Sequence, residues 1–327
     1  MKTNKLQSEK FSLEKATFYD YISIARFDHC IKHVFILPGV ILACLLRGMD
    51  QFEIKNIALG ILTAMSIASA NYVINEWLDR ESDRFHPIKS KRASVQKNLS
   101  AMWVLIEWIF FIFIGISSAY LSSELMLYTA IVFALQGVIY NVRPFRSKDS
   151  AYVDVISESI NNPIRLIIGW AMIAPTSLPP ASLLLAYWLG GAFLMAAKRL
   201  SEYKEIVASH GKKLLIQYRI SFSSYTDISL TISCFIYAML SNFFLAIFLI
   251  KYRIEYILMI PVITILFGQY LAMAMKADSS TQNPEKLYRE KSLIYLITLL
   301  ICVFIFSSLI KIPALLFLIG QNYIQWK

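Results

Sequence analysis

Three side chains that carry oxygen ligands are spaced four residues apart in the stretch NEWLDRESD, which starts at residue 75: Asn75, Asp79 and Asp83. On a helix this spacing places neighbours on one face, about 5 to 6 Å apart. Proteins usually hold Mg²⁺ through one or two carboxylates, together with waters and phosphate oxygens of a substrate. The stripe therefore predicts a Mg²⁺ site for a diphosphate, with Asn75, Asp79 and Asp83 as ligands and the two aspartates also as candidate catalytic groups.

Basic residues follow the stripe at once: His86, Lys89, Lys91 and Arg92. Cationic donors make short, strong hydrogen bonds to phosphate oxygens. Pro87 disfavours a helical conformation for the residue before it, so we expect the helix to end before His86. A lone Asp pair more often marks a solvated helix end, but the pair combined with these cations indicates a polyphosphate substrate, and His86, Lys89 and Arg92 are candidate contacts for it.

A second polar stripe has the spacing i, i+4, i+7, i+11 within an otherwise apolar run: Asp154, Glu158, Asn161 and Arg165. Ionisable groups inside a membrane cost roughly 2.5 to 3.5 kcal/mol each on insertion scales, so such a stripe usually lines a hydrated cavity. We predict Asp154 and Glu158 as catalytic groups and Arg165 as a substrate contact. An internal ion pair between Glu158 and Arg165 is the alternative.

Further candidate substrate contacts share a place at or near the end of an apolar run: Lys32, Tyr140, Arg143, Arg146, Lys148, Lys198, Arg199 and Glu202. The cations among them also have simpler explanations. The cations of 143–148 also serve as topology signals. Cations at 198–199 are favourable near a helix C-terminus for dipole reasons alone. Lys32 has a stem long enough to reach lipid headgroups or a lipid phosphate.

Long apolar runs must position all of these side chains. The 327 residues are 57% hydrophobic and only 17% charged, with a mean hydropathy of +0.54, whereas soluble domains carry about 25% charge. Windows of roughly 17 to 25 apolar residues are long enough to span a bilayer. We predict about nine transmembrane helices, with cores near 34–46, 57–77, 102–121, 125–140, 153–173, 183–197, 228–250, 256–275 and 293–309.

The distribution of Lys and Arg predicts the orientation. Of the 32, 25 fall before the first span and in the even-numbered loops, and six fall on the opposite side. Positively charged loops stay in the cytosol, so the N-terminus and the candidate site are expected to face it. The net charge of +10 is explained by topology and does not indicate nucleic acid. The four cysteines lie in or beside apolar runs without metal-ligand spacing, which argues against disulfides and zinc.

No internal repeat or linker divides the chain. We expect one transmembrane domain over 1–327, with 1–30 as a cytosolic N-terminal segment, in an all-α polytopic fold around a central cavity. The sequence leaves the oligomeric state open.

The signature NEWLDRESD resembles the first Asp-rich motif of the UbiA superfamily of intramembrane prenyltransferases, with Glu76 in the place of the usual Asp. The resemblance covers nearly the whole chain. It implies a nine-span fold, Mg²⁺ as cofactor and transferase chemistry on a diphosphate.

Two segments resemble one branch of that superfamily, the decaprenyl-phosphate phosphoribosyltransferases: DRFHPIKSKR at 83–92 and AKRLSE at 197–202. The second segment stands where prenyltransferases usually carry another Asp-x-x-x-Asp. The resemblance implies transfer of 5-phosphoribose from phosphoribosyl diphosphate to a polyprenyl phosphate in a bacterial inner membrane, for envelope glycan synthesis. The alternatives are a prenyltransferase that uses an isoprenyl diphosphate and a small acceptor, and a lipid transporter.

Overall fold

The computed structural model describes residues 14–50, 52–276 and 290–318, and within these ranges the side chains of 29–32 and 317–318 are not described. The described chain is helical apart from two short parallel strands, β1 (Glu14–Lys15) and β2 (Lys97–Asn98). The α-helices are α1 (Phe18–Ile24), α2 (Leu37–Arg47), α3 (Ile54–Asp83), α4 (Ala93–Gln96), α5 (Ala101–Ser122), α6 (Glu124–Asn141), α7 (Val153–Ser159), α8 (Asn161–Ala171), α9 (Ala181–His210), α10 (Lys212–Tyr218), α11 (Asp227–Tyr252), α12 (Met259–Ala274) and α13 (Lys291–Leu309). The short 3₁₀ helices are η1 (Phe27–Ile36), η2 (Lys89–Lys91), η3 (Ser147–Asp149), η4 (Ile220–Ser223), η5 (Ile254–Leu258) and η8 (Pro313–Leu318).

Seven helices in the described ranges are long and apolar enough to cross a bilayer: α3, α5, α6, α9, α11, α12 with η5, and α13. The predicted all-α polytopic fold is therefore confirmed. The other two predicted spans are occupied by shorter helices, namely α2 and the pair α7 and α8. The count of nine spans and the orientation of the N-terminus stay predictions.

The fifth predicted span, expected as one helix over 153–173, is broken between α7 and α8 at Ile160. Pro163 explains the break. It has no N–H to donate to the carbonyl of Ser159, and its ring clashes with that carbonyl.

Side chains of neighbouring helices satisfy carbonyls at this break. Gln136 of α6 donates to the carbonyl of Ser157, and Trp188 of α9 donates to that of Ile156 at 3.0 Å. Asn161 donates to the carbonyl of Glu158 at 3.0 Å. Irregular backbone at membrane depth is tolerated only where such partners exist.

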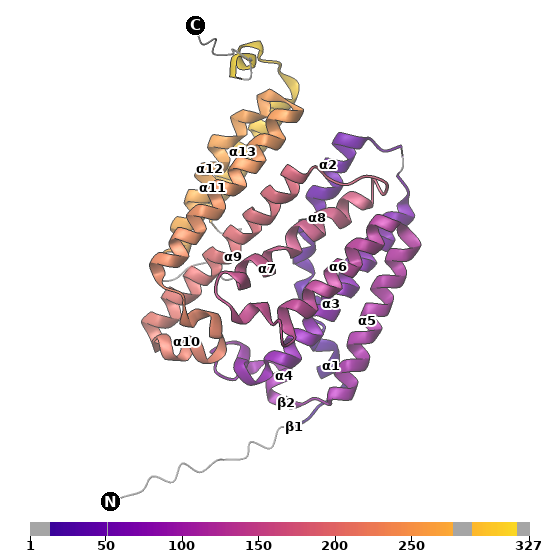
Figure 1. Ribbon diagram of the computed structural model, residues 1–327, viewed down its shortest axis with the longest axis vertical. Helices are drawn as coiled ribbons and strands as arrows, with labels where there is room; N and C mark the ends of the chain where they lie inside the picture. Colours follow the sequence, from indigo (N-terminus) through magenta and orange to yellow (C-terminus); the bar gives the residue numbers. More distant parts are fainter. Residues whose placement is uncertain (1–13, 51, 277–289, 319–327) are drawn as a thin grey trace, which may run out of the picture.

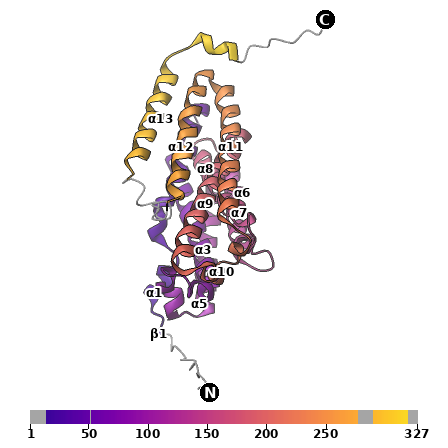
Figure 2. The same cartoon turned by 90° about the vertical axis from the view of Figure 1, so that its left-hand side faces the viewer.

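Figures 1 and 2 show the helices as a bundle in which α11, α12 and α13 form one flank and α3, α5 and α6 the other, with α8 and α9 between them. Helices α2 and α8 cross closely. A Cβ on Gly39 would lie 2.0 Å from the carbonyl oxygen of Leu166, and one on Gly169 would lie 2.1 Å from that of Ile36. Small residues permit such backbone contact between membrane helices.

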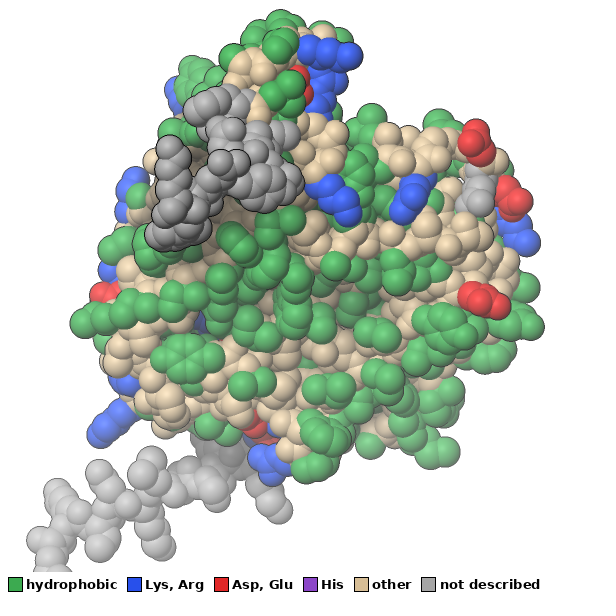
Figure 3. Space-filling view, turned by 45° about the horizontal axis from the view of Figure 1, so that its top comes forward, with side chains coloured by type: hydrophobic (Ala, Val, Ile, Leu, Met, Phe, Trp, Pro, Cys, Tyr) green, Lys and Arg blue, Asp and Glu red, His purple; other side chains and the backbone are tan. Residues whose placement is uncertain are grey.

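The surface of the bundle fits a lipid environment. Hydrophobic side chains form a broad band in Figure 3, with Lys, Arg, Asp and Glu gathered toward its edges. Large apolar residues such as Phe113 and Phe235 are more than half exposed to the outside of the bundle. We name the end of the bundle where α3 finishes, at the bottom of Figure 1, the site end.

Candidate active site

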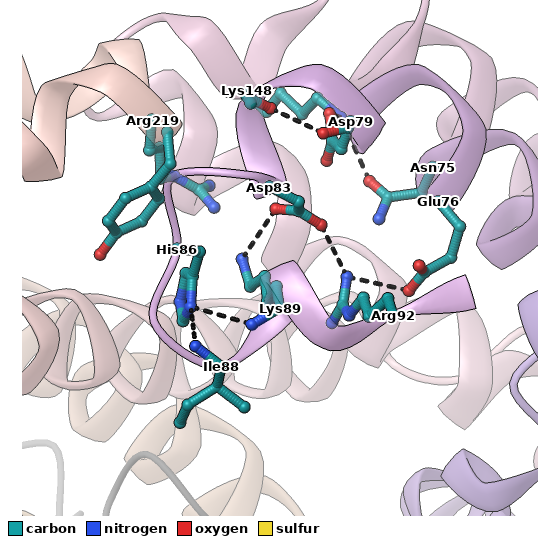
Figure 4. Close-up of polar contacts among 12 residues, drawn as sticks. Asn75, Glu76, Asp79, Asp83, His86, Ile88, Lys89, Arg92, Lys148 and Arg219 are labelled. Carbon is teal, nitrogen blue, oxygen red and sulfur yellow. Dashed lines mark hydrogen bonds and ion pairs between the residues drawn. The ribbon is translucent and has the colours of Figure 1, made fainter. Parts of the chain in front are cut away.

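The last two turns of α3 bring the predicted metal ligands to the site end. Lys148 donates from Nζ to Oδ1 of Asp79 at 2.5 Å and to Oδ1 of Asn75 at 3.2 Å (Figure 4). Arg146 donates from Nη2 to the same Asp79 oxygen at 2.9 Å. These cations of the loop after α6 therefore contact two of the predicted metal ligands, Asn75 and Asp79, directly.

That loop holds its cations in a strained backbone. Arg146 has φ 26° and Tyr152 has φ 67°, both in the left-handed region, a conformation that costs of order 1 to 3 kcal/mol for such residues. Lys148 is anchored further by Oδ1 of Asn141 at 2.8 Å. Burial lowers the pKa of Lys148 to about 8, although the charge of Asp79 opposes this shift.

The loop after α3 supplies the cations that contact Asp83, another predicted metal ligand. Nη1 of Arg92 lies 2.9 Å from Oδ2 of Asp83, and Nζ of Lys89 lies 3.7 Å from Oδ1 (Figure 4). Arg92 also contacts Glu76 at 2.9 Å. Glu76, which stands where the superfamily has Asp, is buried by contacts with Arg26 and Ser94, each at 3.0 Å. It therefore ties the loop to the N-terminal segment.

His86 fixes the same loop against α9 and α10. Its Nδ1 accepts from the backbone N–H groups of Ile88 and Lys89 at 3.1 and 3.2 Å, which requires a neutral ring to carry its proton on Nε2. Nε2 lies 3.6 Å from Glu202, and the ring packs on Tyr218 with centroids 4.6 Å apart. Helix α3 ends at Asp83, so the expected end before His86 is confirmed.

Arg199 of α9 joins the carboxylates of the second stripe. It contacts Glu158 at 2.6 Å, Asp154 at 3.4 Å and Glu202 at 3.4 Å, and its side chain is only 3% exposed. The charge of neighbouring Lys198 also acts on Glu158. The segment AKRLSE thus places an arginine among three carboxylates.

Asp154 lies beneath the site surface. Its side chain is 0% exposed, and it accepts hydrogen bonds from Tyr225 at 2.6 Å, Ser221 at 3.1 Å and Arg219 at 3.2 Å. The spacing that predicted a catalytic role for Asp154 did not distinguish a residue that lines the site from one that is buried beneath it. In this arrangement Asp154 is a positioning residue for the arginines, whereas Glu158 is 29% exposed and faces the site.

Arg219, in the connection between α10 and η4, is a site residue that sequence reasoning missed. Its Nη2 donates to the hydroxyl of Tyr140 at 2.9 Å, and that hydroxyl donates to Glu158 at 2.9 Å. Burial acts to lower the pKa of Arg219, but nearby Tyr140, Asp154 and Glu158 outweigh it and hold this pKa well above its usual value. No local motif marks Arg219, and its place emerges only when the connection between α10 and η4 brings it to Tyr140 of α6 and Asp154 of α7.

The other predicted substrate contacts, Arg143, Arg165 and Lys32, differ in where the structure places them. Arg143 is exposed and contacts no described site residue. Arg165 is 8% exposed, interacts with Tyr72 and lies 5.5 Å from the ring centroid of Phe133. Its alternative pairing with Glu158 is wrong, because Glu158 pairs with Arg199 instead. The side chain of Lys32 lies outside the described residues.

The donor set suits Mg²⁺ held jointly with a substrate. No group of three His, Cys, Asp or Glu side chains converges on a metal position in the described ranges. Asp79 and Asp83 provide separate carboxylates and Asn75 an amide oxygen, which matches the one or two protein carboxylates that Mg²⁺ takes beside phosphate oxygens. The ammonium and guanidinium groups on these carboxylates balance their charge.

Replacing Asp154 with Asn tests the positioning role. The change removes the fully buried carboxylate that Arg199 and Arg219 share, and breaking a buried ion pair typically costs about 3 to 5 kcal/mol. We expect a clear fall in the melting temperature of the detergent-solubilised protein. Asp149→Asn is the matched control, since Asp149 is 29% exposed and its ion pair is with Arg146. An unchanged melting temperature for Asp154→Asn would contradict the assignment.

Fold and site together define a helical membrane protein with a polar, cation-rich site at one end of its bundle. The chain belongs to the UbiA prenyltransferase family, whose sequence model matches residues 36–297. The family predicted from the Asp-rich motif is thereby confirmed, and the phosphoribosyltransferase branch stays a prediction.

Solved structures share the fold. A UbiA homolog from Archaeoglobus fulgidus bound to DMAPP and Mg²⁺ is 17% identical, with a TM-score of 0.66 over 89% of this chain and 100% of that one. The same homolog bound to GPP and Mg²⁺ gives a TM-score of 0.63, also at 17% identity, over 88% of this chain and 99% of that one. A digeranylgeranylglyceryl phosphate synthase gives 0.62 at 14% identity, over 89% and 98%.

Among curated proteins, the uncharacterized protein y4nM of Sinorhizobium fredii is 28% identical over 151 residues. The match covers 46% of this chain and 28% of that relative, so the chain spans little more than a quarter of its length.

Proposed function

We propose that this protein transfers 5-phosphoribose from phosphoribosyl diphosphate to a polyprenyl phosphate, with Mg²⁺ and release of diphosphate. The observation that carries the proposal is Arg199 among Asp154, Glu158 and Glu202. In the prenyltransferase pattern this part of the sixth span carries a second Asp pair for metal. Here this position carries Lys198 and Arg199 in place of a second Asp pair, so the α3 stripe is the proposed metal site.

The charge of the site suits a heavily phosphorylated donor. Phosphoribosyl diphosphate carries about five negative charges near neutral pH, against about three for a prenyl diphosphate, because a phosphomonoester has a second pKa of about 6. Arg146 and Lys148 meet the metal stripe from one side and Lys89 and Arg92 from the other. On binding, these cations exchange carboxylate partners for phosphate oxygens.

Each part of the site has a role in the proposed reaction. Asn75, Asp79 and Asp83 would hold Mg²⁺, which when bound would supply charge stabilisation for the departing diphosphate. Lys148 and Arg146 orient the diphosphate, while Lys198, Arg199 and Arg219 face the 5-phosphate of the donor. Glu158 and the hydroxyl of Tyr140 offer acceptors to the ribose hydroxyls, and Arg165 is a less direct contact farther along the span.

The bond changes need no dedicated base. An oxygen of the lipid phosphate forms the new bond to ribose C1, and the bond from C1 to the diphosphate oxygen breaks with its electron pair. The phosphate is largely ionised near neutral pH, since its second pKa is about 6. The sites of bond making and breaking face the cytosol of a bacterial inner membrane in this proposal, as the charge bias predicts.

Prenyl transfer to a small acceptor is the second candidate. The observation that favours it is the fold shared with homologs bound to DMAPP or GPP and Mg²⁺. Membership of a transferase family argues against the transport alternative.

Direct assay separates the two reactions. Purified protein is incubated with Mg²⁺, labelled phosphoribosyl diphosphate and polyprenyl phosphate, and the label is followed into the lipid phase; a parallel assay uses labelled geranyl diphosphate and aromatic acceptors. Label in the lipid from the ribose donor supports the proposal. Turnover of the prenyl donor alone overturns it.

Lys198→Ala distinguishes the donors by mutation. Loss of one charge-assisted contact is expected to raise the KM for phosphoribosyl diphosphate about tenfold. Lys213→Ala, an exposed lysine of α10 at the same end, is the control and should leave the KM unchanged. Equal KM values for Lys198→Ala and the parent protein would remove Lys198 from the donor site.

A further inference from the structure

A cavity of about 570 Å³ opens at the site end, between the N-terminal segment and the loop after α3. Its volume is within the range of small-molecule sites, roughly 300 to 1,000 Å³. Residues 19–28, which form one wall, precede the region matched by the UbiA family, which begins at residue 36. The cavity is therefore partly built from sequence outside the matched family domain.

The cavity has an excess of positive charge. Four cations line it, Arg26, Lys89, Lys91 and Arg92, against two carboxylates, Asp28 and Glu76. Arg26 binds Asp28 at 3.1 Å and Glu76 at 3.0 Å. Lys91 is exposed and makes no ion pair with any described residue. The cavity therefore presents an uncompensated cation beside guanidinium groups, which suits a phosphate.

The backbone of Arg26 is held in place to form this wall. It lies in the left-handed region with φ 54°, at the joint between α1 and η1. Its ion pairs to Asp28 and to Glu76 of α3 oppose this strain. Residues kept in such conformations by surrounding contacts concentrate at binding sites.

The same cavity has an apolar side. Tyr19 and Ile88 line it and are 76% and 71% exposed, and Ile22 and Phe27 are 39% and 43% exposed. A free sugar phosphate or inorganic phosphate gains nothing from these side chains. A phosphate attached to a hydrocarbon chain uses both sides, because basic pockets at a membrane surface bind lipid head groups.

Two of the cations connect the cavity to the candidate active site. Arg92 contacts Glu76, which lines the cavity, and also Asp83 of the metal stripe, both at 2.9 Å (Figure 4). Lys89 lines the cavity and lies 3.7 Å from Asp83. A phosphate in the cavity is thus a neighbour of the donor diphosphate.

We infer that this cavity binds the phosphate of the lipid acceptor, with the start of its polyprenyl chain against Tyr19, Ile22 and Ile88. The inference rests on the proposed transfer to a lipid phosphate and adds the place where that lipid enters the reaction. Arg26, which was not among the predicted site residues, becomes an acceptor-site residue.

Photolabelling tests the location without requiring turnover. Polyprenyl phosphate that carries a diazirine near its phosphate is irradiated with the full-length protein in Mg²⁺-containing nanodiscs, and labelled peptides are mapped by mass spectrometry. We expect label in 19–28 and 88–93, competed by polyprenyl phosphate but not by polyprenol or inorganic phosphate. If inorganic phosphate competes as well as polyprenyl phosphate does, the cavity is a general anion site. That result, or label in other segments, would overturn the inference.

A kinetic test uses the unpaired lysine. Lys91→Glu is expected to raise the KM for polyprenyl phosphate about tenfold and to leave the KM for phosphoribosyl diphosphate within twofold. Lys213→Glu is the matched control for charge reversal at the same end. An unchanged lipid KM in an active enzyme overturns the cavity assignment and leaves the proposed function standing. Suppose that the cavity is labelled, with competition by polyprenyl phosphate and not by polyprenol, but no transfer is detected. That result refutes the proposed transfer reaction and retains the lipid site.

Discussion

Replacing Asp79 with Asn is expected to lower transfer activity by at least about 10³-fold, whichever donor the enzyme uses. Asp79 is the central residue of the α3 stripe, and both Lys148 and Arg146 bind its Oδ1. The amide keeps the shape of the side chain but removes the charge that Mg²⁺ needs. Activity is measured by transfer of label to the lipid phase at saturating Mg²⁺.

Glu81→Gln is the matched control for this change. Glu81 lies two residues farther along α3, is 78% exposed and pairs with Arg80 at 3.8 Å. We expect its activity to stay within twofold of the parent protein, because exposed ion pairs contribute little. Circular dichroism and gel filtration confirm that both variants fold. A folded Asp79→Asn protein with full activity would overturn the metal assignment.

Arg199→Gln is expected to lower kcat/KM for phosphoribosyl diphosphate about 10²-fold and to destabilise the protein as well. The substitution leaves Asp154, Glu158 and Glu202 together without their shared cation. Breaking a buried ion pair by removing one partner typically costs about 3 to 5 kcal/mol. Thermal unfolding in detergent measures this loss, and steady-state kinetics measures the change in donor use.

Arg199→Lys separates the two effects. Lysine retains the charge and so most of the stability, but it lacks the planar fork that reaches several carboxylates at once. We expect a melting temperature near that of the parent protein and a donor KM that stays elevated. Arg253→Gln removes an arginine that pairs with Glu255 beyond the far end of α11 and should leave donor kinetics unchanged. A normal donor KM for Arg199→Lys would show that Arg199 acts only on stability.

The common face of the proposed metal ligands was predictable because it depends on local spacing alone. Asn75, Asp79 and Asp83 are on one helix, so a period of about four residues determines their common face. The segment 198–202 was predictable for the same reason, as part of one helix end. Family membership followed from the same motif and is confirmed by the match over 36–297.

Contacts between distant segments were not predictable in this way. Arg219 meets Tyr140 across 79 positions of sequence, and Arg26 meets Glu76 across 50. Both arginines were counted only as topology signals, since nothing in their own neighbourhood distinguishes them from other loop cations. Lys148 was identified, but its contact with Asp79 depends on the fold of the loop after α6.

The second polar stripe shows a different limit. Its spacing assumed one straight helix over 153–173, whereas Pro163 breaks the span at Ile160. Asp154 and Glu158 lie before the break, and Arg165 lies after it. The predicted stripe continued through the proline and therefore grouped residues whose side chains have different surroundings.

The break between α7 and α8 also bears on how the enzyme moves. Backbone groups at a hinge exchange hydrogen-bond partners during motion. Here the carbonyls of Ser157 and Ile156 accept hydrogen bonds from Gln136 of α6 and Trp188 of α9. Bending here would require the loss of both hydrogen bonds, and leaving buried carbonyls unpaired is costly. We therefore expect the centre of the bundle to be rigid. We expect admission of substrates to depend on the peripheral loops at the site end, so hydrogen exchange should be slow in 153–171 and faster in 84–97 and 142–152.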